Sequence, residues 1–271
     1  MTIRLTKHHA LGNDFLVTFA EIGIADAPDL ARRWCERRRG IGADGLMLAS
    51  EVDGADARMV LFNADGSRAE MSGNGIRCFA QAVVRRDAVS RTELVVLTDA
   101  GLRLVTIHPV TNAHDTDTIE ASVDMGLVEP IAEPDGWAAI GANPDRPVAH
   151  LSVGNPHTVV GVDDVAAIDL LTLGQKIPAV NLEIVEPGPE AHAVTMRVHE
   201  RGAGITKACG TGACATAWAA AAWGLVSPDA SELVVHMDGG SATVALNQPT
   251  PGRVTLRGPA TYIATIDVPF S

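Results

Sequence analysis

The sequence is short of aromatic residues and of positive charge, which argues against nucleic acid as a partner. One tyrosine, five phenylalanines and four tryptophans occur in 271 residues, leaving little material for stacking on bases. The formal net charge of −12 repels nucleic acid and anionic membranes unless cations cluster. We expect the one tight cluster, 37–39, to be the solvated end of a helix, where arginines complement the dipole. The composition therefore predicts a small-molecule substrate, no nucleic acid and no membrane partner.

Paired cysteines and targeting segments are also lacking. The four cysteines, Cys35, Cys78, Cys209 and Cys214, form no CxxC pair and have no spacing typical of a zinc site or a disulfide framework. We expect free thiols and no metal. No run of about eighteen apolar residues occurs without a charge, and the start, MTIRLTKHHA, does not read as a signal peptide. These absences predict a cytoplasmic protein.

Alternating apolar and polar residues dominate the chain, as is typical of antiparallel strands. The clearest such strands are 15–22, 57–63, 93–98, 102–109, 194–200, 232–237, 241–246 and 253–258. Helical patterns occupy only 28–40, 73–86, 169–177 and 210–224. Many strands with few helices predict the α+β class and exclude a doubly wound sheet.

A faint duplication runs through the chain. The motif LGN at 11–13 returns as VGN at 153–155, and SGNG at 72–75 returns as CGTG at 209–212. From Asn13 to Ser72 is 59 residues and from Asn155 to Cys209 is 54, so order and spacing both match. We infer two similar halves, and we expect the ligand in a cleft between them.

Cys209 is the strongest catalytic candidate. Its flanking glycines and the helix that follows would present backbone N–H groups and a positive dipole end to a carboxylate. The same field favours thiolate over thiol, so we expect Cys209 to be more reactive than Cys78 or Cys214. Ser72 stands at the matching place in the other half. If one residue removes a proton from an α-carbon and the other delivers one to the opposite face, the stereocentre inverts without a cofactor.

Polar residues near these motifs suit an amino acid substrate, although each alone is also typical of a turn or cap. Arg201 and several asparagines can donate hydrogen bonds to carboxylates, and Glu200 can take an ammonium group. The set comprises Asn13, Asn63, Asn155, Asn181, His157, Glu200 and Arg201. No motif for pyridoxal phosphate accompanies them.

At these residues the chain resembles the diaminopimelate epimerase family. The matching motifs are HALGNDF (9–15), FNADGS (62–67), SGNGIRC (72–78), VGNPH (153–157), VN (180–181), HERGAG (199–204) and ACGTGACA (208–215). The likeness runs from about residue 3 to the C-terminus. It implies two pseudo-symmetric α/β domains, each a curved, mostly antiparallel sheet around a central helix. It also implies cofactor-independent interconversion of LL- and meso-2,6-diaminopimelate by two cysteines, a step of lysine and peptidoglycan synthesis.

The same resemblance assigns roles to individual residues. Cys209 matches one catalytic cysteine, and His157 matches a histidine close to the second cysteine. Gly210 and Thr211 match backbone donors to the substrate carboxylate. The other substrate-binding positions are Asn13, Asn63, Gly73, Asn74, Asn155, Asn181, Glu200 and Arg201.

The resemblance also sets expectations for the domains and the assembly. The N-terminal half would comprise 1–116 plus 262–271, because the last strand, 261–268, returns to it, and the C-terminal half would comprise 117–261. A homodimer is compatible with the sequence, which carries no pattern that decides the oligomeric state.

Two positions depart from the family pattern. Gly45 follows Asp44 where the family usually offers a polar residue, so we expect one side-chain contact to be lost. Ser72 stands where the first catalytic cysteine belongs, and a hydroxyl is a far poorer base than a thiolate. Three explanations stay open: an engineered variant, a natural epimerase in which Ser72 relays protons, or a drift to another reaction.

Other functions also remain open at this point. Cys209 with His157 or His199 as its base would give a thiol hydrolase or acyl transferase. A proline or hydroxyproline racemase shares the two-base scheme. A catalytically impaired diaminopimelate binder is the non-enzymatic alternative, and Ser72 is the residue that favours it.

Overall fold

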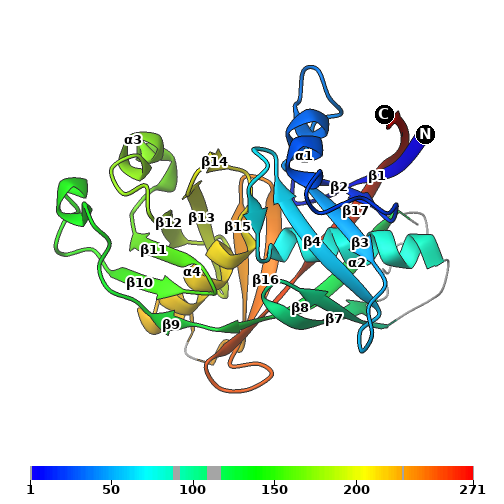
Figure 1. Ribbon diagram of the computed structural model, residues 1–271. Coiled ribbons are helices and arrows are strands. Elements are labelled where there is room, and N and C mark those ends of the chain that lie inside the picture. The colour runs from blue at the N-terminus through cyan, green and yellow to red at the C-terminus, as the bar shows by residue number, and fades with distance from the viewer. Residues whose placement is uncertain (1, 88–91, 109–116, 228, 271) are drawn as a thin grey trace. The chain divides into compact units, whose positions relative to one another are not determined.

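Figure 1 shows the computed structural model of the chain, which describes residues 2–87, 92–108, 117–227 and 229–270. The chain packs into two compact units. Unit 1 comprises residues 1–123 with 258–271, and unit 2 comprises residues 124–257. The sequence predicted that the halves divide after residues 116 and 261, and that division remains a prediction. No described helix is both long and apolar enough to cross a membrane.

Unit 1 holds most of its strands in the first half of the chain. Its helices are α1 (Ala27–Cys35) and α2 (Gly73–Asp87). Its strands are β1 (Thr2–Ala10), β2 (Asn13–Thr18), β3 (Gly45–Ser50), β4 (Ala57–Asn63), β5 (Arg68–Ala69), β6 (Glu93–Thr98) and β7 (Gly101–His108), with the first part of β8 (Thr118–Leu127) and the second part of β17 (Arg253–Pro269).

Unit 2 repeats this succession of elements. Its helices are α3 (Leu170–Gly174) and α4 (Gly210–Ala222), with short 3₁₀ turns η1 (Trp137–Ile140) and η2 (Val165–Ala167). Its strands are β9 (Glu129–Pro130), β10 (Val148–Ser152), β11 (Pro156–Gly161), β12 (Asn181–Pro187), β13 (Ala193–Glu200), β14 (Gly204–Thr206), β15 (Glu232–Met237) and β16 (Gly240–Leu246), with the remaining parts of β8 and β17.

The two units pair their strands in the same pattern. In unit 1, β1 is antiparallel to β2, β2 parallel to β3, β3 antiparallel to β4, and β4 antiparallel to β5 but parallel to β6. In unit 2 the same relations join β10 to β11, β11 to β12, β12 to β13, and β13 to β14 and β15. The predicted α+β class with mostly antiparallel sheets is confirmed.

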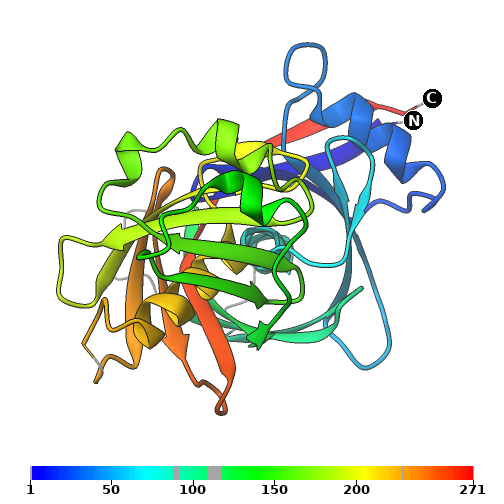
Figure 2. The same ribbon diagram turned by 90° about the vertical axis from the view of Figure 1, so that its left-hand side faces the viewer.

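One long helix is buried in each unit. Every residue of α2 from Gly73 to Val83 is buried, which is typical of a helix covered on all sides. Figure 2 shows α2 (cyan) end-on, inside the curve of the unit 1 strands. In unit 2, α4 packs against β10 to β13, β15 and β16. Its many alanines let these strands approach closely.

Most predicted strands occur, but several boundaries differ. The strand predicted at 15–22 is β2, which ends at Thr18, and residue 109 of the predicted strand 102–109 lies outside the described residues. The segments 253–258 and 261–268 belong to one continuous strand, β17, whose end pairs with β1. The helix predicted at 169–177 covers only Leu170–Gly174.

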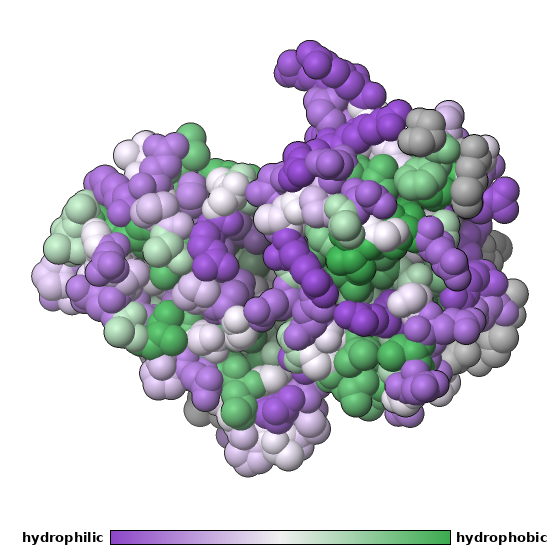
Figure 3. All heavy atoms as spheres, in the orientation of Figure 1, coloured by the Kyte–Doolittle hydropathy of each residue, from purple (hydrophilic) through white to green (hydrophobic). Residues whose placement is uncertain are grey.

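The surface of unit 1 is not uniformly polar. Figure 3 shows hydrophobic patches on it, one of them over β7. Leu102 and Leu104 of that strand are 56% and 46% exposed. Two leucines of β7 are therefore exposed, while Val105 and Ile107 of the same strand are buried.

The arginine cluster at 37–39 does not end a helix as predicted, because α1 stops at Cys35. The Arg37 guanidinium bonds to Asp14 Oδ1 and to Asp44 Oδ1, both at 2.7 Å. Lys7 Nζ lies 2.9 Å from Asp14 Oδ2. Burial raises the pKa of Asp14, but the hydrogen bonds from Arg37 and Lys7 outweigh burial and hold it below its usual value. This network joins β1 and β2 to the segment that leads into β3.

Replacing Asp14 by asparagine tests this network. Asp14→Asn should lower the free energy of unfolding at neutral pH by about 1 to 3 kcal/mol, because charged hydrogen bonds are lost. The folded-state pKa lies below the unfolded value, so the contribution is present above about pH 4 and is lost as the pH falls through the folded pKa. Urea unfolding at several pH values should show the difference shrinking in acid.

A matched control is Asp29→Asn, whose carboxylate pairs with Arg32 but is 85% exposed. Such surface pairs contribute at most about 1 kcal/mol. A stability difference between Asp14→Asn and the unmodified chain that stayed constant from neutral pH into acid would contradict the network's role.

Candidate active site

Ser72 caps the central helix of unit 1. Its Oγ accepts the backbone N–H of Gly75 at 3.0 Å, and its carbonyl accepts that of Ile76 at 2.8 Å. A Cβ at position 75 would lie 3.0 Å from the Ser72 Cβ and 2.8 Å from Met47 Cε. The second glycine of SGNG is therefore needed by the packing of the cap.

Cys209 caps the central helix of unit 2 in the same way. Its Sγ accepts the N–H of Gly212 at 3.3 Å, and its carbonyl accepts that of Ala213 at 2.9 Å. A Cβ at position 212 would lie 3.2 Å from Sγ. Gly210 and Thr211 occupy the first helical positions, whose N–H groups have no acceptor within a helix. The matching glycine motifs thus have matching geometry.

The expectation that the helix end favours the Cys209 thiolate does not hold in this structure. Burial raises the pKa of the thiol well above its usual value, and the nearby carboxylates of Glu200 and Glu183 raise it further. Hydrogen bonds from Thr211 and Gly212 oppose these effects without overcoming them. Cys209 is therefore a protonated thiol near neutral pH.

Glu200 is the carboxylate that raises the pKa of the thiol most. Burial raises its pKa, while hydrogen bonds with Thr206 and Cys209 and the charge of His157 lower it. The Thr206 hydroxyl donates to Glu200 Oε1. The predicted ammonium acceptor thus lies beside the predicted catalytic thiol.

His157 is held from both sides. Its Nδ1 lies 2.7 Å from Glu183 Oε1, and its Nε2 lies 2.9 Å from Asn155 Oδ1. Both His157 and Glu183 are fully buried. Asn181 bonds through Nδ2 to the Pro156 carbonyl and accepts the N–H of Arg201 at 2.8 Å. These contacts bring together Asn155, His157, Asn181 and Arg201, whose roles in binding substrate stay predictions.

Sequence reasoning missed Glu183. A charged residue in the middle of the buried run NLEIV was the available signal.

The predicted residues of unit 1 form a polar chain behind the cap. Asn13 donates to Asp44 Oδ2 at 2.7 Å and accepts from Asn74 at 3.3 Å. The fully buried Arg77 donates to Asn74 Oδ1 at 2.9 Å and to the Gly73 carbonyl at 3.1 Å. Arg77 was also missed, although an arginine in an apolar helix signals a buried role.

Asn63 stands apart from this chain. Its Nδ2 donates to Ser67 Oγ at 3.0 Å, within the turn between β4 and β5. Its substrate-binding role stays a prediction.

Gly45 departs from the family pattern for a local reason. A Cβ at this position would lie 2.8 Å from the Phe62 carbonyl oxygen and 3.2 Å from Phe15 Cδ1. A larger residue would have to push β3 away from β4. The close packing of β3 against β4 therefore requires glycine at position 45.

Two observations bear on other kinds of chemistry. Within the described residues, no group of three or more histidines, cysteines, aspartates or glutamates is placed to hold a metal. Neither His157 nor His199 has a described hydrogen bond to Cys209, and His199 packs against Gly174 instead. Among the described residues, no hydrogen bond therefore joins the Cys209 thiol to an imidazole.

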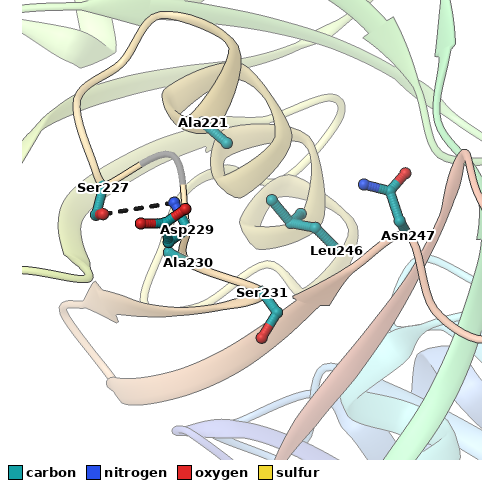
Figure 4. Close-up of a pocket in the computed structure, with 7 residues that line it drawn as sticks. All are labelled: Ala221, Ser227, Asp229, Ala230, Ser231, Leu246 and Asn247. Atoms are coloured by element: carbon teal, nitrogen blue, oxygen red, sulfur yellow. Dashed lines mark hydrogen bonds between the residues drawn. The ribbon is translucent and has the colours of Figure 1, made fainter.

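A cavity of about 470 Å³ lies elsewhere in unit 2. Figure 4 shows its lining residues, Ala221, Ser227, Asp229, Ala230, Ser231, Leu246 and Asn247. Ala221 belongs to the C-terminal end of α4, whereas Cys209 caps its N-terminus. At the rise of an α-helix these positions are about 18 Å apart. The cavity is thus not the place of the predicted chemistry.

Comparisons with known proteins agree with the motifs. The family model described as diaminopimelate epimerase matches residues 5–129 and 150–263. Proteins named diaminopimelate epimerase from Desulforapulum autotrophicum and Desulfitobacterium hafniense are 39% and 37% identical, covering 98% and 96% of both chains.

Solved structures share the fold at low identity. A phenazine biosynthesis protein of the PhzF family from Bacillus anthracis has a TM-score of 0.79 at 16% identity and covers all of both chains. A hydroxyproline epimerase from Agrobacterium vitis has a TM-score of 0.67 at 17% identity, covering 98% of this chain and 91% of that one. The family model and the sequence relatives show that the chain belongs to the diaminopimelate epimerase family.

Proposed function

We propose that the chain is a cofactor-independent isomerase that interconverts LL- and meso-2,6-diaminopimelate, a step of lysine and peptidoglycan synthesis. The observation that carries the proposal is the cap of α4, where the Cys209 thiol lies beside the N–H groups of the first helical turn. Relatives at 35% to 39% identity are named diaminopimelate epimerase.

The reaction needs one proton removed and one delivered. The C–H bond at the α-carbon breaks, the proton goes to a base, and the electron pair spreads into the adjacent carboxylate. Backbone N–H groups of Gly210 and Thr211 would stabilise that charge. A proton from the opposite acid then forms the new C–H bond and inverts the centre. Cys209, protonated at rest, supplies one of these acid–base groups.

Substrate binding would use the polar residues around each cap. Glu200 accepts the ammonium group, and the Arg201 guanidinium donates to a carboxylate. Gly73, Asn74, Asn13, Asn63, Asn155 and Asn181 complete the proposed binding set, and His157 acts beside the catalytic groups.

Ser72 takes the second acid–base position in this proposal. Stabilisation by a helix dipole is about 1 kcal/mol and shifts a pKa by less than one unit, so the hydroxyl alone is a weak base. Because Oγ accepts from the Gly75 amide, its own O–H is free to donate. Ser72 therefore acts as a proton donor or relay. Its weakness as a base also supports a second candidate function, a diaminopimelate binder with impaired catalysis.

Homodimer formation and a cytoplasmic location stay predictions. Size-exclusion chromatography with light scattering would measure the first.

Hydrogen exchange at the α-carbon tests the proposed reaction. In deuterated water the protein should replace the α-protons of diaminopimelate, followed by loss of their NMR signals. Cys209→Ala should slow exchange by roughly 10² to 10⁴-fold, as expected when an acid–base group is removed. Cys214→Ala, in the same helix, is the matched control and should keep most of the exchange. Exchange at the full rate in Cys209→Ala would refute the assignment.

Restoring a thiol at position 72 tests the second half-site. Ser72→Cys should leave exchange unchanged or make it faster, because a thiol gives up its proton far more readily than a hydroxyl. Ser50→Cys, at the exposed end of β3, controls for the added thiol. A large loss of exchange in Ser72→Cys would show that serine has a specific role. Binding of meso-diaminopimelate by calorimetry without exchange in either protein would identify the impaired binder.

A further inference from the structure

The two units differ in one buried pair at equivalent positions. In the parallel pairing of β11 with β12, His157 lies opposite Asn181 and Glu183 opposite Val159. The same positions of β2 and β3 in unit 1 are Phe15 and Met47. Unit 2 therefore buries an imidazole and a carboxylate where unit 1 buries two apolar side chains.

The helix caps confirm that these side chains fill the same space. A Cβ on Gly75 would lie 2.8 Å from Met47 Cε, and a Cβ on Gly212 would lie 2.6 Å from Glu183 Oε1. In both units the strand residue sits directly beneath the first turn of the central helix. Because unit 1 fills this space with methionine, packing does not require a charge there.

A buried carboxylate carries a cost that an apolar residue avoids. Replacing a buried ion pair by well-packed apolar residues is often neutral or stabilising. Glu183 accepts from His157 through Oε1, but Oε2 has no hydrogen-bond partner among the described residues. Stability of the fold therefore does not explain the presence of Glu183.

We propose that Glu183 is a positioning residue that orients the His157 imidazole and places a buried carboxylate beside the thiol of Cys209. The inference deepens the proposed function and rests on it, since it concerns the acid–base thiol of the same site.

The orienting role follows from the hydrogen bonds of the ring. A proton on His157 Nδ1, donated to Glu183 at 2.7 Å, fixes the ring plane and turns Nε2 toward Asn155. Asn155 belongs to the proposed binding set. Glu183 thus acts on the substrate through His157 and Asn155, without touching it.

The charge near the thiol comes from few groups. Glu200 and Glu183 both disfavour the Cys209 thiolate, and His157 in turn lowers the pKa of Glu200. Of the other titratable groups on the strands packed against α4, Glu232 is exposed and most have hydrogen-bond partners elsewhere. His150 bonds to Thr158, Glu186 to the Val165 amide, Arg197 to Asp238 and His236 to Glu190, while His199 packs on Gly174. Removing the charge of Glu183 should therefore make the thiol easier to ionise.

Alkylation of Cys209 by iodoacetamide measures this directly. The rate at Cys209, followed by peptide mass spectrometry over a pH series, gives the midpoint of thiol ionisation. Glu183→Gln keeps the size and the acceptor but removes the charge. It should lower the midpoint by about one pH unit, which is about tenfold faster alkylation below the midpoint. Glu186→Gln, on the same strand, is the matched control.

A merely structural role gives a different result. If Glu183→Gln only loosened α4, alkylation would rise equally at every pH and the midpoint would not move. An unchanged or raised midpoint overturns the proposal.

A second variant guards against failure to fold. Glu183→Met combined with His157→Phe copies the pair of unit 1 and should keep or raise the unfolding temperature while also lowering the midpoint. If this variant unfolds at a clearly lower temperature, the buried pair has a structural role and the proposal is wrong.

The unmodified protein provides a third test. Nitrogen-15 shifts of the His157 ring should show Nδ1 protonated, and a bare Nδ1 would refute the orienting role. None of these measurements needs turnover. Absence of hydrogen exchange in the unmodified protein would refute the proposed function and leave the thiol and ring measurements to decide the role of Glu183.

Discussion

One hydrogen bond in each unit fixes much of the rest: the side chain at the start of the central helix accepts the N–H three residues later. This bond brings the side chain over the first turn, so the residue at that turn must be a glycine. The strand residue beneath this turn is Met47 in unit 1 and Glu183 in unit 2. The first amides of the helix remain available to a ligand. The same residue thus caps the helix and places a reactive group beside amides that can bind an anion.

The units share a backbone pattern but use it differently. Around Cys209 the buried groups are ionisable, and their charges act on the thiol. Around Ser72 the polar groups run away from the cap, from Asn74 to Asn13 and Asp44, and end in the Arg37 network. We expect that network to stabilise unit 1, whereas the stability of unit 2 does not require the buried pair of His157 and Glu183. The two units thus share the geometry of the cap and differ in the charges buried beneath it.

The sequence predicted those features that depend on local rules. Glycines after Ser72 and Cys209 marked the two helix starts, and alternating residues marked most strands of each unit. The end of α1 escaped prediction because Arg37 bonds to Asp14, which precedes it by 23 residues, and to Asp44 in the segment that leads into β3. Glu183 and Arg77 escaped because burial of a charge depends on partners that only the fold brings close. The protonation of Cys209 escaped for the same reason: Glu200 was expected in the same site, but the burial of the thiol, which raises its pKa most, and the position of Glu183 depend on the fold.

The protonated thiol has a consequence for how the proposed reaction begins. With Cys209 a thiol and Ser72 a hydroxyl, neither group is a base at rest. A substrate that places its ammonium group on Glu200 would cancel the charge that opposes the thiolate more strongly than the charge of Glu183 does. The pKa of Cys209 would then fall as the substrate binds, while burial, the largest cause of its rise, would remain. Glu183, beneath the helix and away from the substrate, would keep its charge and limit that fall. The substrate would neutralise Glu200 but not Glu183. The balance between these two carboxylates would decide how readily the thiol exchanges its proton.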